Sequence, residues 1–88
     1  MWQVAMSSSV RKKIEKLPLD YKNEIFRCIY NLRFWPDVSD FKDINKMSDN
    51  KDTYRIRIGV YRLIFKLEKE YLFIKIVKVA HRKDAYKK

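Results

Sequence analysis

The feature that most constrains the fold of this chain is the segment Thr53–Leu67, in which apolar and charged residues alternate on both sides of Gly59. Alternation with a period of two is typical of a half-buried β-strand, and two such runs around a glycine predict a β-hairpin. Gly59 is the only glycine in the chain. As the first residue of a two-residue type II′ turn it accepts a positive φ without a Cβ clash. We therefore expect Gly59-Val60 to form the turn.

This turn fixes the pairing, so that Arg57 lies opposite Arg62. Directly opposed residues share a face of the sheet. The predicted apolar face carries Tyr54, Ile56, Ile58, Tyr61, Leu63 and Phe65, and the predicted basic face carries Arg55, Arg57, Arg62, Ile64 and Lys66. Opposed like charges destabilise a sheet, whereas guanidinium groups match phosphate oxygens in geometry. A solvated basic face is the plain structural interpretation, but the arginine pair favours an anion site.

The composition indicates one small domain, residues 1–88, with a packed core, because 47% of the 88 residues are hydrophobic. The net charge of +10 points to a polyanionic partner. Most of that charge belongs to residues 51–88, which hold twelve lysines and arginines against four acids. One cysteine gives neither a disulfide framework nor metal-ligand spacing, and no segment resembles a membrane span or a signal peptide. We therefore expect a cytoplasmic protein without membrane, metal or cofactor.

The first half of the chain predicts a strand and two helices. Trp2–Met6 is a short apolar strand, and a serine among residues 7–9 caps a helix that ends at Pro18. A second amphipathic helix begins near Leu19 or Asp20 and ends at Pro36. We expect both helices to pack on the apolar face of the sheet and to leave the basic face uncovered. Residues 36–52 predict a loop, with or without one helical turn, whose carboxylates form no convincing metal or acid–base pair.

A third long strand is predicted over Tyr71–Ala80, and its apolar residues indicate a central position. The expected partners are Leu67 with Leu72, Phe65 with Ile74, Leu63 with Ile76 and Ile64 with Lys75. The tail from His81 then leaves the sheet beside the Gly59-Val60 turn, close to Arg57 and Arg62. This convergence of basic residues is the strongest functional signal in the sequence.

These residues have the chemistry to bind and cleave RNA. The arginines expected to surround a phosphate are Arg55, Arg57, Arg62 and Arg82, with Lys66, Lys75 and Lys83 as further RNA contacts. Ile64 and Val77 form an apolar floor, Tyr86 offers a ring for base stacking, and His81 is the side chain suited to proton transfer near neutral pH. Together they support attack of a 2′-OH on the adjacent phosphate without a metal ion.

The order of elements and two motifs resemble the RelE/ParE superfamily of type II toxins. The motifs are residues 54–65, YRIRIGVYRLIF, and residues 79–86, VAHRKDAY. The resemblance implies an α+β fold of order β-α-α-β-β-β, with two N-terminal helices on a twisted, mainly antiparallel sheet. For the RelE branch it implies a ribosome-dependent endoribonuclease that cuts mRNA in the ribosomal A site. It also implies a cognate antitoxin that wraps and silences the toxin.

Carried over to this sequence, the resemblance assigns roles to single residues. Arg62 is similar to the phosphate-stabilising arginine, Arg82 to the residue that protonates the leaving group, and Tyr86 to the stacking aromatic. Arg55 and Arg57 stand where well-studied RelE proteins have lysines, one of them the proposed base. An arginine is practically never deprotonated, so either His81 is the base or Arg55 acts only through its charge.

Other functions fit the same sequence. The ParE branch resembles this fold but poisons DNA gyrase, and the tail with Arg82 and Tyr86 argues against that branch. An inactive toxin homologue or a non-catalytic nucleic-acid-binding module are the remaining alternatives.

Overall fold

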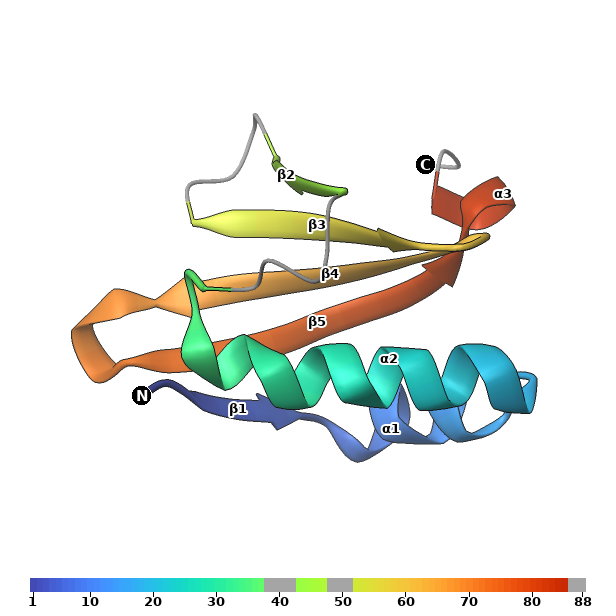
Figure 1. The fold of residues 1–88 in the computed structure, drawn as a ribbon, viewed down its shortest axis with the longest axis horizontal. Helices are drawn as coiled ribbons and strands as arrows, with labels where there is room; N and C mark the ends of the chain where they lie inside the picture. Colours follow the sequence, from blue (N-terminus) through green and yellow to red (C-terminus); the bar gives the residue numbers. More distant parts are fainter. Residues whose placement is uncertain (38–42, 48–51, 86–88) are drawn as a thin grey trace.

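The computed structural model describes residues 1–37, 43–47 and 52–85, and the side chains of these up to residue 83. Two helices lie against one face of a five-stranded sheet (Figure 1), which confirms the predicted α+β fold. The elements in chain order are β1 (Gln3–Met6), α1 (Ser8–Glu15), α2 (Leu19–Asn31), the 3-10 turn η1 (Leu32–Phe34), β2 (Ile44–Lys46), β3 (Thr53–Ile58), β4 (Tyr61–Glu68), the 3-10 turn η2 (Lys69–Tyr71), β5 (Phe73–His81) and α3 (Arg82–Ala85).

The two helices begin at residues that the sequence marks, but they end earlier than predicted: α1 ends at Glu15, before Pro18, and α2 ends at Asn31, where η1 follows before Pro36. Ser7 caps α1, because its side chain accepts a hydrogen bond of 3.2 Å from the Val10 backbone N–H. Pro18 separates the helices and serves as the N-cap residue of α2. Asp20 in the first turn of α2 places a negative charge at the positive end of the helix dipole. The predicted helical hairpin is therefore confirmed.

The strands follow the order β1-β5-β4-β3-β2 across the sheet. β1 runs parallel to β5, and the other neighbouring pairs are antiparallel. The prediction of a loop throughout residues 36–52 was wrong, because Ile44–Lys46 forms the edge strand β2 and pairs with β3. Three residues are too few to show alternation, and a short, polar edge strand is a common protection against unwanted pairing. The rest of that predicted loop lies partly outside the described residues.

The predicted pairing of β5 was wrong by two residues. Leu67 pairs with Ile74 and Phe65 with Ile76, because η2 and Leu72 lengthen the connection that had been expected to be a tight turn. Leu72 adopts a left-handed conformation with φ of 51°. The pairing then shifts again, since Ile64 lies opposite Lys78 and not opposite Lys75. Val77 is the extra residue of this β-bulge.

The bulge exchanges the two faces of β5. Ile74 and Ile76 point toward the helices before it, and Val79 and His81 do so after it. Lys78 and Ala80 consequently share the face of the sheet with Arg62 and Ile64. The predicted apolar floor was therefore wrong at Val77, which is 45% exposed, and Lys78 occupies the position opposite Ile64.

The core lies between the helices and the inner face of the sheet. Ile14, Ile25, Ile56 and Phe65 are fully buried, and each such side chain contributes about 1.5–3 kcal/mol of hydrophobic stabilisation. The remaining buried apolar residues are Val10, Cys28, Ile29, Leu32, Ile58, Leu63, Leu67, Ile74, Ile76 and Val79. Within the described part of the chain, no helix is long and apolar enough to cross a membrane.

Candidate functional site

The central hairpin has the predicted register. β3 pairs with β4 so that Arg57 lies opposite Arg62 and Ile58 opposite Tyr61. Gly59 has φ of 60°, as a primed hairpin turn requires at this position. A Cβ at Gly59 would lie 2.3 Å from Cε1 of Tyr21. The ring of Tyr21, which belongs to α2, therefore packs directly on the glycine. The turn is thus fixed both by backbone conformation and by this contact, and the two arginines are fixed with it.

Three arginines meet at the end of the sheet. Arg57, Gly59, Arg62 and Arg82 line a cavity of about 370 Å³, which we call the arginine pocket. Arg82 reaches it because its backbone N–H donates a hydrogen bond of 2.6 Å to the carbonyl oxygen of Val60 in the turn. The tail is therefore attached to the hairpin where the sequence predicted, and three guanidinium groups from two distant segments surround one space.

The arginines of this pocket differ in their exposure. Arg62 is only 4% exposed, whereas Arg57 and Arg82 are exposed. The expectation of an uncovered basic face was therefore wrong at Arg62, because α3 lies at this end of the sheet (Figure 1). A buried arginine loses side-chain freedom before a ligand arrives, so less entropy is lost on binding. The pocket combines one fixed guanidinium group with two exposed ones.

Further basic residues continue along the same face in rows across the strands. Arg55, Ile64 and Lys78 form the row next to the arginine pocket, and Lys66 with Lys75 forms the following one. Lys66 makes an exposed ion pair of 3.6 Å with Glu68, which contributes little to stability. Lys83 is exposed on α3. The sequence missed Lys78, because its place on this face depends on the bulge.

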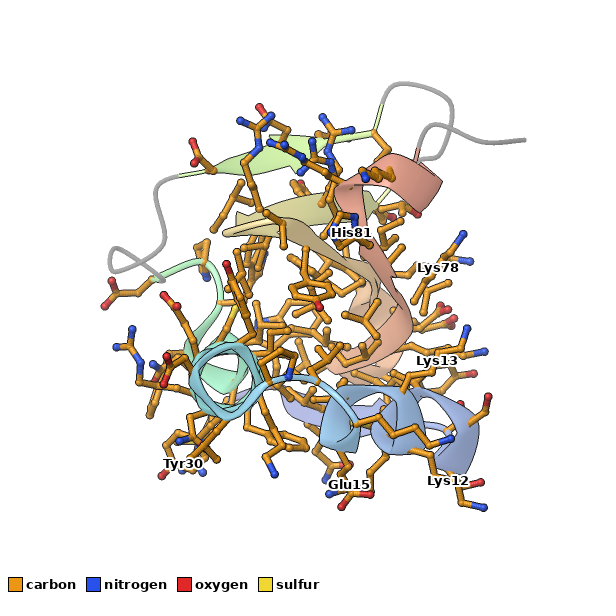
Figure 2. The ribbon with its side chains drawn as sticks, turned by 90° about the vertical axis from the view of Figure 1, so that its right-hand side faces the viewer. Lys12, Lys13, Glu15, Tyr30, Lys78 and His81 are labelled. Carbon is orange, nitrogen blue, oxygen red and sulfur yellow. The ribbon has the colours of Figure 1, made fainter. Side chains whose placement is uncertain are left out.

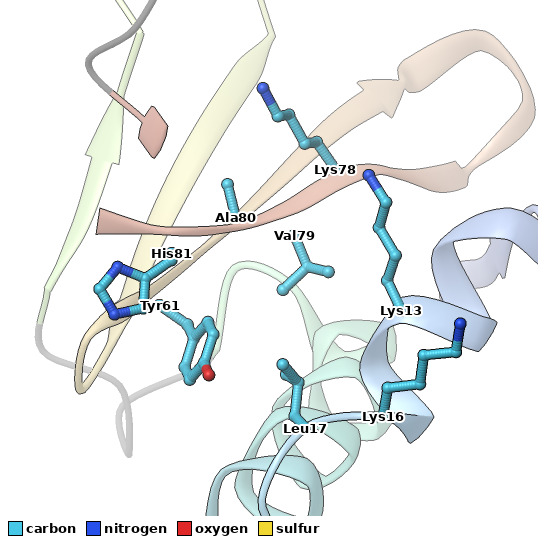
Figure 3. Close-up of a pocket in the computed structure, with 8 residues that line it drawn as sticks. All are labelled: Lys13, Lys16, Leu17, Tyr61, Lys78, Val79, Ala80 and His81. Atoms are coloured by element: carbon cyan, nitrogen blue, oxygen red, sulfur yellow. The ribbon is translucent and has the colours of Figure 1, made fainter. Parts of the chain in front are cut away.

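His81 does not lie with the arginines. It pairs with Tyr61 on the helix side of the sheet, and the centroids of the two rings are 5.5 Å apart. Its Nδ1 accepts a hydrogen bond of 3.2 Å from the Lys83 backbone N–H. The ring lines a second cavity with Lys13, Lys16, Leu17, Tyr61, Lys78, Val79 and Ala80 (Figure 3). Tyr86, the predicted stacking residue, lies outside the described residues.

The arginine pocket is suited to bind an anion and to stabilise negative charge. Arginine keeps its proton throughout the pH range of proteins, so these side chains donate hydrogen bonds and do not act as bases. Among the residues that the structure describes, no group of three histidine, cysteine, aspartate or glutamate side chains is placed to hold a metal ion. Of the titratable groups in the described ranges, the thiol of Cys28 has a clearly shifted pKa, which burial raises to about 12, and it lies in the core.

The comparisons with known proteins agree with this architecture. Residues 4–86 match the model of the family described as the ParE toxin of the type II toxin–antitoxin system parDE. The chain belongs to this family of toxins. It is therefore a type II toxin of the RelE/ParE superfamily, as the sequence motifs had suggested. No curated protein sequence is significantly similar to the toxin.

Solved structures of RelE proteins share the fold of this toxin. The archaeal RelE of the RelE–RelB complex from Pyrococcus horikoshii is 27% identical with a TM-score of 0.78, and the match covers 92% of the toxin and 94% of that chain. The RelB–RelE complex from Methanococcus jannaschii gives 23% identity and a TM-score of 0.77 over 93% and 94% of the two chains. Isolated RelE from E. coli gives 16% and 0.74 over 92% and 84%.

Proposed function

We propose that this toxin is a ribosome-dependent endoribonuclease that cuts mRNA in the ribosomal A site. The observation that carries the proposal is the convergence of Arg57, Arg62 and Arg82 on one cavity, with Arg62 buried. Three guanidinium groups around one space match a phosphate diester whose negative charge increases during cleavage. The structural similarity to RelE proteins supports the proposal, because it shows that the toxin shares their fold.

In the proposed reaction the 2′-OH of one nucleotide attacks the adjacent phosphorus. The new O2′–P bond forms as the P–O5′ bond breaks, which leaves a 2′,3′-cyclic phosphate and a 5′-hydroxyl. Arg62 and Arg57 stabilise the charge on the non-bridging oxygens. Arg82 donates a hydrogen bond to the leaving O5′, which takes its proton from solvent. Arg55 acts through its charge from the next row of the sheet. Solvent accepts the proton of the 2′-OH, because His81 lines a different cavity. Tyr86 stacks on a base of the substrate.

We also propose that a cognate antitoxin covers the toxin. The proteins from Pyrococcus horikoshii and Methanococcus jannaschii were both solved as complexes of RelE with RelB. In this toxin, Leu19, Tyr30 and Phe34 of the helical layer are 63%, 58% and 44% exposed, and apolar side chains of this size favour contact with a partner. Free toxin acts where ribosomes and mRNA are, in the cytoplasm.

A second candidate function is inhibition of DNA gyrase. The observation in its favour is the family model, which is that of ParE toxins. This alternative predicts that growth arrest depends on DNA damage and not on loss of mRNA. The arginine pocket would then have no catalytic role.

Controlled expression of the toxin in bacteria separates these functions. The nuclease predicts growth arrest with mRNA ends that fall at a fixed position within codons, mapped by sequencing of 5′ ends. The gyrase inhibitor predicts an SOS response with DNA breaks and intact mRNA. Co-expression of the antitoxin is the control, since it should abolish either effect. Growth without arrest at confirmed expression would indicate an inactive homologue.

A further inference from the structure

The second cavity lies at the outer edge of β5. β1 pairs only with Phe73–Ile76, and after Met6 the chain turns away into α1. The end of α1 therefore lies beside Lys78–His81, and the space between them is a cavity of about 470 Å³. We call it the lysine pocket. Figure 3 shows Lys13 and Lys16 reaching it from the helical side, while Tyr61 and His81 lie together at its other end.

The lysine pocket carries positive charge without compensation from its own lining. Lys13, Lys16 and Lys78 are all exposed, and the described residues that line the pocket include no carboxylate. Lys13 and Lys78 project on the same side of the molecule, whereas Lys12 and Glu15 point away from β5 (Figure 2). The nearest acid of α1 therefore does not neutralise the pocket. Ammonium groups of this kind bind phosphate as point charges.

The bulge at Val77 gives the pocket its mixed chemistry. It turns Val79 and His81 toward the helices and leaves Lys78 at the rim. His81 accepts a hydrogen bond at Nδ1, so its neutral ring carries the proton on Nε2 and offers a donor there. Leu17 and Val79 add apolar surface beside the rings of Tyr61 and His81. Cations next to aromatic and apolar groups are the combination that binds a single-stranded nucleic acid.

The lysine pocket and the arginine pocket lie on opposite faces of the sheet, both at the end of β5. Tyr61 and His81 line the first, and their chain neighbours Arg62 and Arg82 line the second. Successive strand residues point to opposite faces, and β1 pairs with β5 only as far as Ile76, so a flexible strand with regularly spaced phosphates can pass from one pocket to the other over the edge of β5. An isolated anion would need only one pocket, and an acidic peptide would not explain the rings.

We propose that the lysine pocket binds a phosphate of the same RNA strand whose cleavage site occupies the arginine pocket. This inference rests on the proposed nuclease function, because it assigns a neighbouring nucleotide of that substrate. The lysine pocket holds and aligns the strand, and the chemistry takes place in the arginine pocket.

The test measures binding of a single-stranded 2′-O-methyl RNA oligonucleotide, which has no free 2′-OH and cannot be cleaved by the proposed reaction. The dissociation constant is determined at several salt concentrations for the purified toxin and its variants. Lys13→Ala/Lys16→Ala removes two cations from the pocket, and Lys12→Ala removes one from the same helix outside it. All three lysines are exposed, so folding should persist, and circular dichroism checks this.

We expect the double variant to bind roughly two- to fivefold more weakly for each lysine removed. The slope of log affinity against log salt should fall by about 0.7 for each phosphate that the protein no longer neutralises, as for single strands in general. Lys78→Ala should weaken binding about as much as Lys13→Ala or Lys16→Ala alone. Lys12→Ala should leave both the affinity and its salt dependence unchanged. Equal effects of Lys12→Ala and Lys13→Ala would overturn the inference, since only general charge would then matter.

A parallel series with Arg57→Ala/Arg82→Ala separates this inference from the proposed function. Binding that depends on the arginines and not on the lysines would reject the lysine pocket and leave the nuclease proposal standing. Binding that depends on neither set would reject both. Binding that depends on the lysines alone would reject a single strand that occupies both pockets. A glutamate-rich peptide that binds the lysine pocket more tightly than RNA would assign the pocket to a protein partner and overturn the inference.

Discussion

The arginine pocket and the lysine pocket lie on either side of the end of β5, and they are built in different ways. Arg57 and Arg62 come from paired strands, and Arg82 is attached to the turn between those strands by a backbone hydrogen bond. Lys13 comes from α1, Lys16 from the C-cap of that helix, and Lys78 from an irregular strand edge. Paired strands hold side chains at fixed spacing, whereas exposed lysines on separate elements remain mobile.

This difference suggests a division of labour. A transition state is stabilised by groups that are already in place, because their reorganisation would cost free energy at the moment of reaction. Buried Arg62 meets that condition, and the exposed lysines do not. We therefore expect substitutions in the arginine pocket to affect the rate of cleavage, and substitutions in the lysine pocket to affect mainly affinity and its dependence on salt.

The largest effect is expected in the arginine pocket. Arg62→Met keeps most of the buried volume but removes the charge, and Arg82→Ala removes an exposed guanidinium group. Each should lower the cleavage rate by about 10²–10³-fold, as loss of one electrostatic stabiliser usually does. Single-turnover cleavage of ribosome-bound mRNA measures this. Arg11→Ala is the matched control, because Arg11 lies on α1 beside Phe26. A loss no greater than that of the control would show that the pocket is not catalytic.

The next effect is expected at the turn that positions the arginines. Gly59→Ala places a Cβ at a positive φ and 2.3 Å from the ring of Tyr21. The backbone conformation alone costs about 1–2 kcal/mol, and the clash adds to it. The free energy of unfolding should therefore fall, and cleavage should fall more than salt-dependent RNA binding by the lysine pocket. Denaturant unfolding of the single variants and of Gly59→Ala/Tyr21→Ala separates the two costs. Additive effects in this cycle would argue against the contact.

A smaller effect is expected for His81→Ala, which alters the lysine pocket and removes none of the residues that line the arginine pocket. Removal of a general base usually costs about 10²–10⁴-fold in rate. His81 lies on the helix side of the sheet, so the loss should stay far below that range. The pH profile of cleavage should keep its shape when His81 is replaced. A severe loss, accompanied by disappearance of a titration near neutral pH, would assign the base to His81 after all.

The smallest effect on cleavage is expected at Cys28, which lies in the core and in neither pocket. Burial raises the pKa of its thiol from 9.0 to about 12, so the native thiol should resist alkylation at neutral pH. In the unfolded chain the thiol loses its proton near the ordinary pKa of 9.0. The associated stability is therefore complete below pH 9 and is lost as the pH rises toward 12, at about 1.4 kcal/mol per pH unit.

Denaturant titrations of the toxin and of Cys28→Ala at pH 8 and pH 10.5 measure this loss, because the variant lacks the cysteine contribution. Cleavage activity at neutral pH is the second readout, and it should be the same in any Cys28→Ala protein that remains folded. Equal pH dependence of the two proteins would contradict the buried thiol.

The sequence predicted the arginine pocket better than the lysine pocket for a physical reason. A two-residue turn at the only glycine fixes the register of β3 and β4, and the register fixes the faces of Arg57 and Arg62. The position of β5 depends instead on η2, on the left-handed Leu72 and on the bulge at Val77. Alternation indicates none of these, so the partners of Lys75 and the place of Lys78 were missed.

The contacts that α1 and α2 make with the sheet could not be predicted from the sequence, for a related reason. Helical periodicity predicts which face of each helix is buried, but not which strand residues lie next to Lys13 or which turn contacts Tyr21. Such contacts depend on how complete elements pack. The bulge at Val77, which turns His81 toward the helices, explains why His81, close in sequence to Arg82, lines a separate cavity.

The most direct test of the central claim uses purified toxin, released from its antitoxin, and ribosomes stalled on a defined mRNA. Primer extension then locates the new 5′ ends. We predict one cleavage within the A-site codon for the unmodified toxin, little cleavage of the same mRNA without ribosomes, and an intact mRNA with Arg62→Met. Intact ribosome-bound mRNA in the presence of folded toxin, together with inhibition of DNA gyrase by the same preparation, would contradict the nuclease assignment.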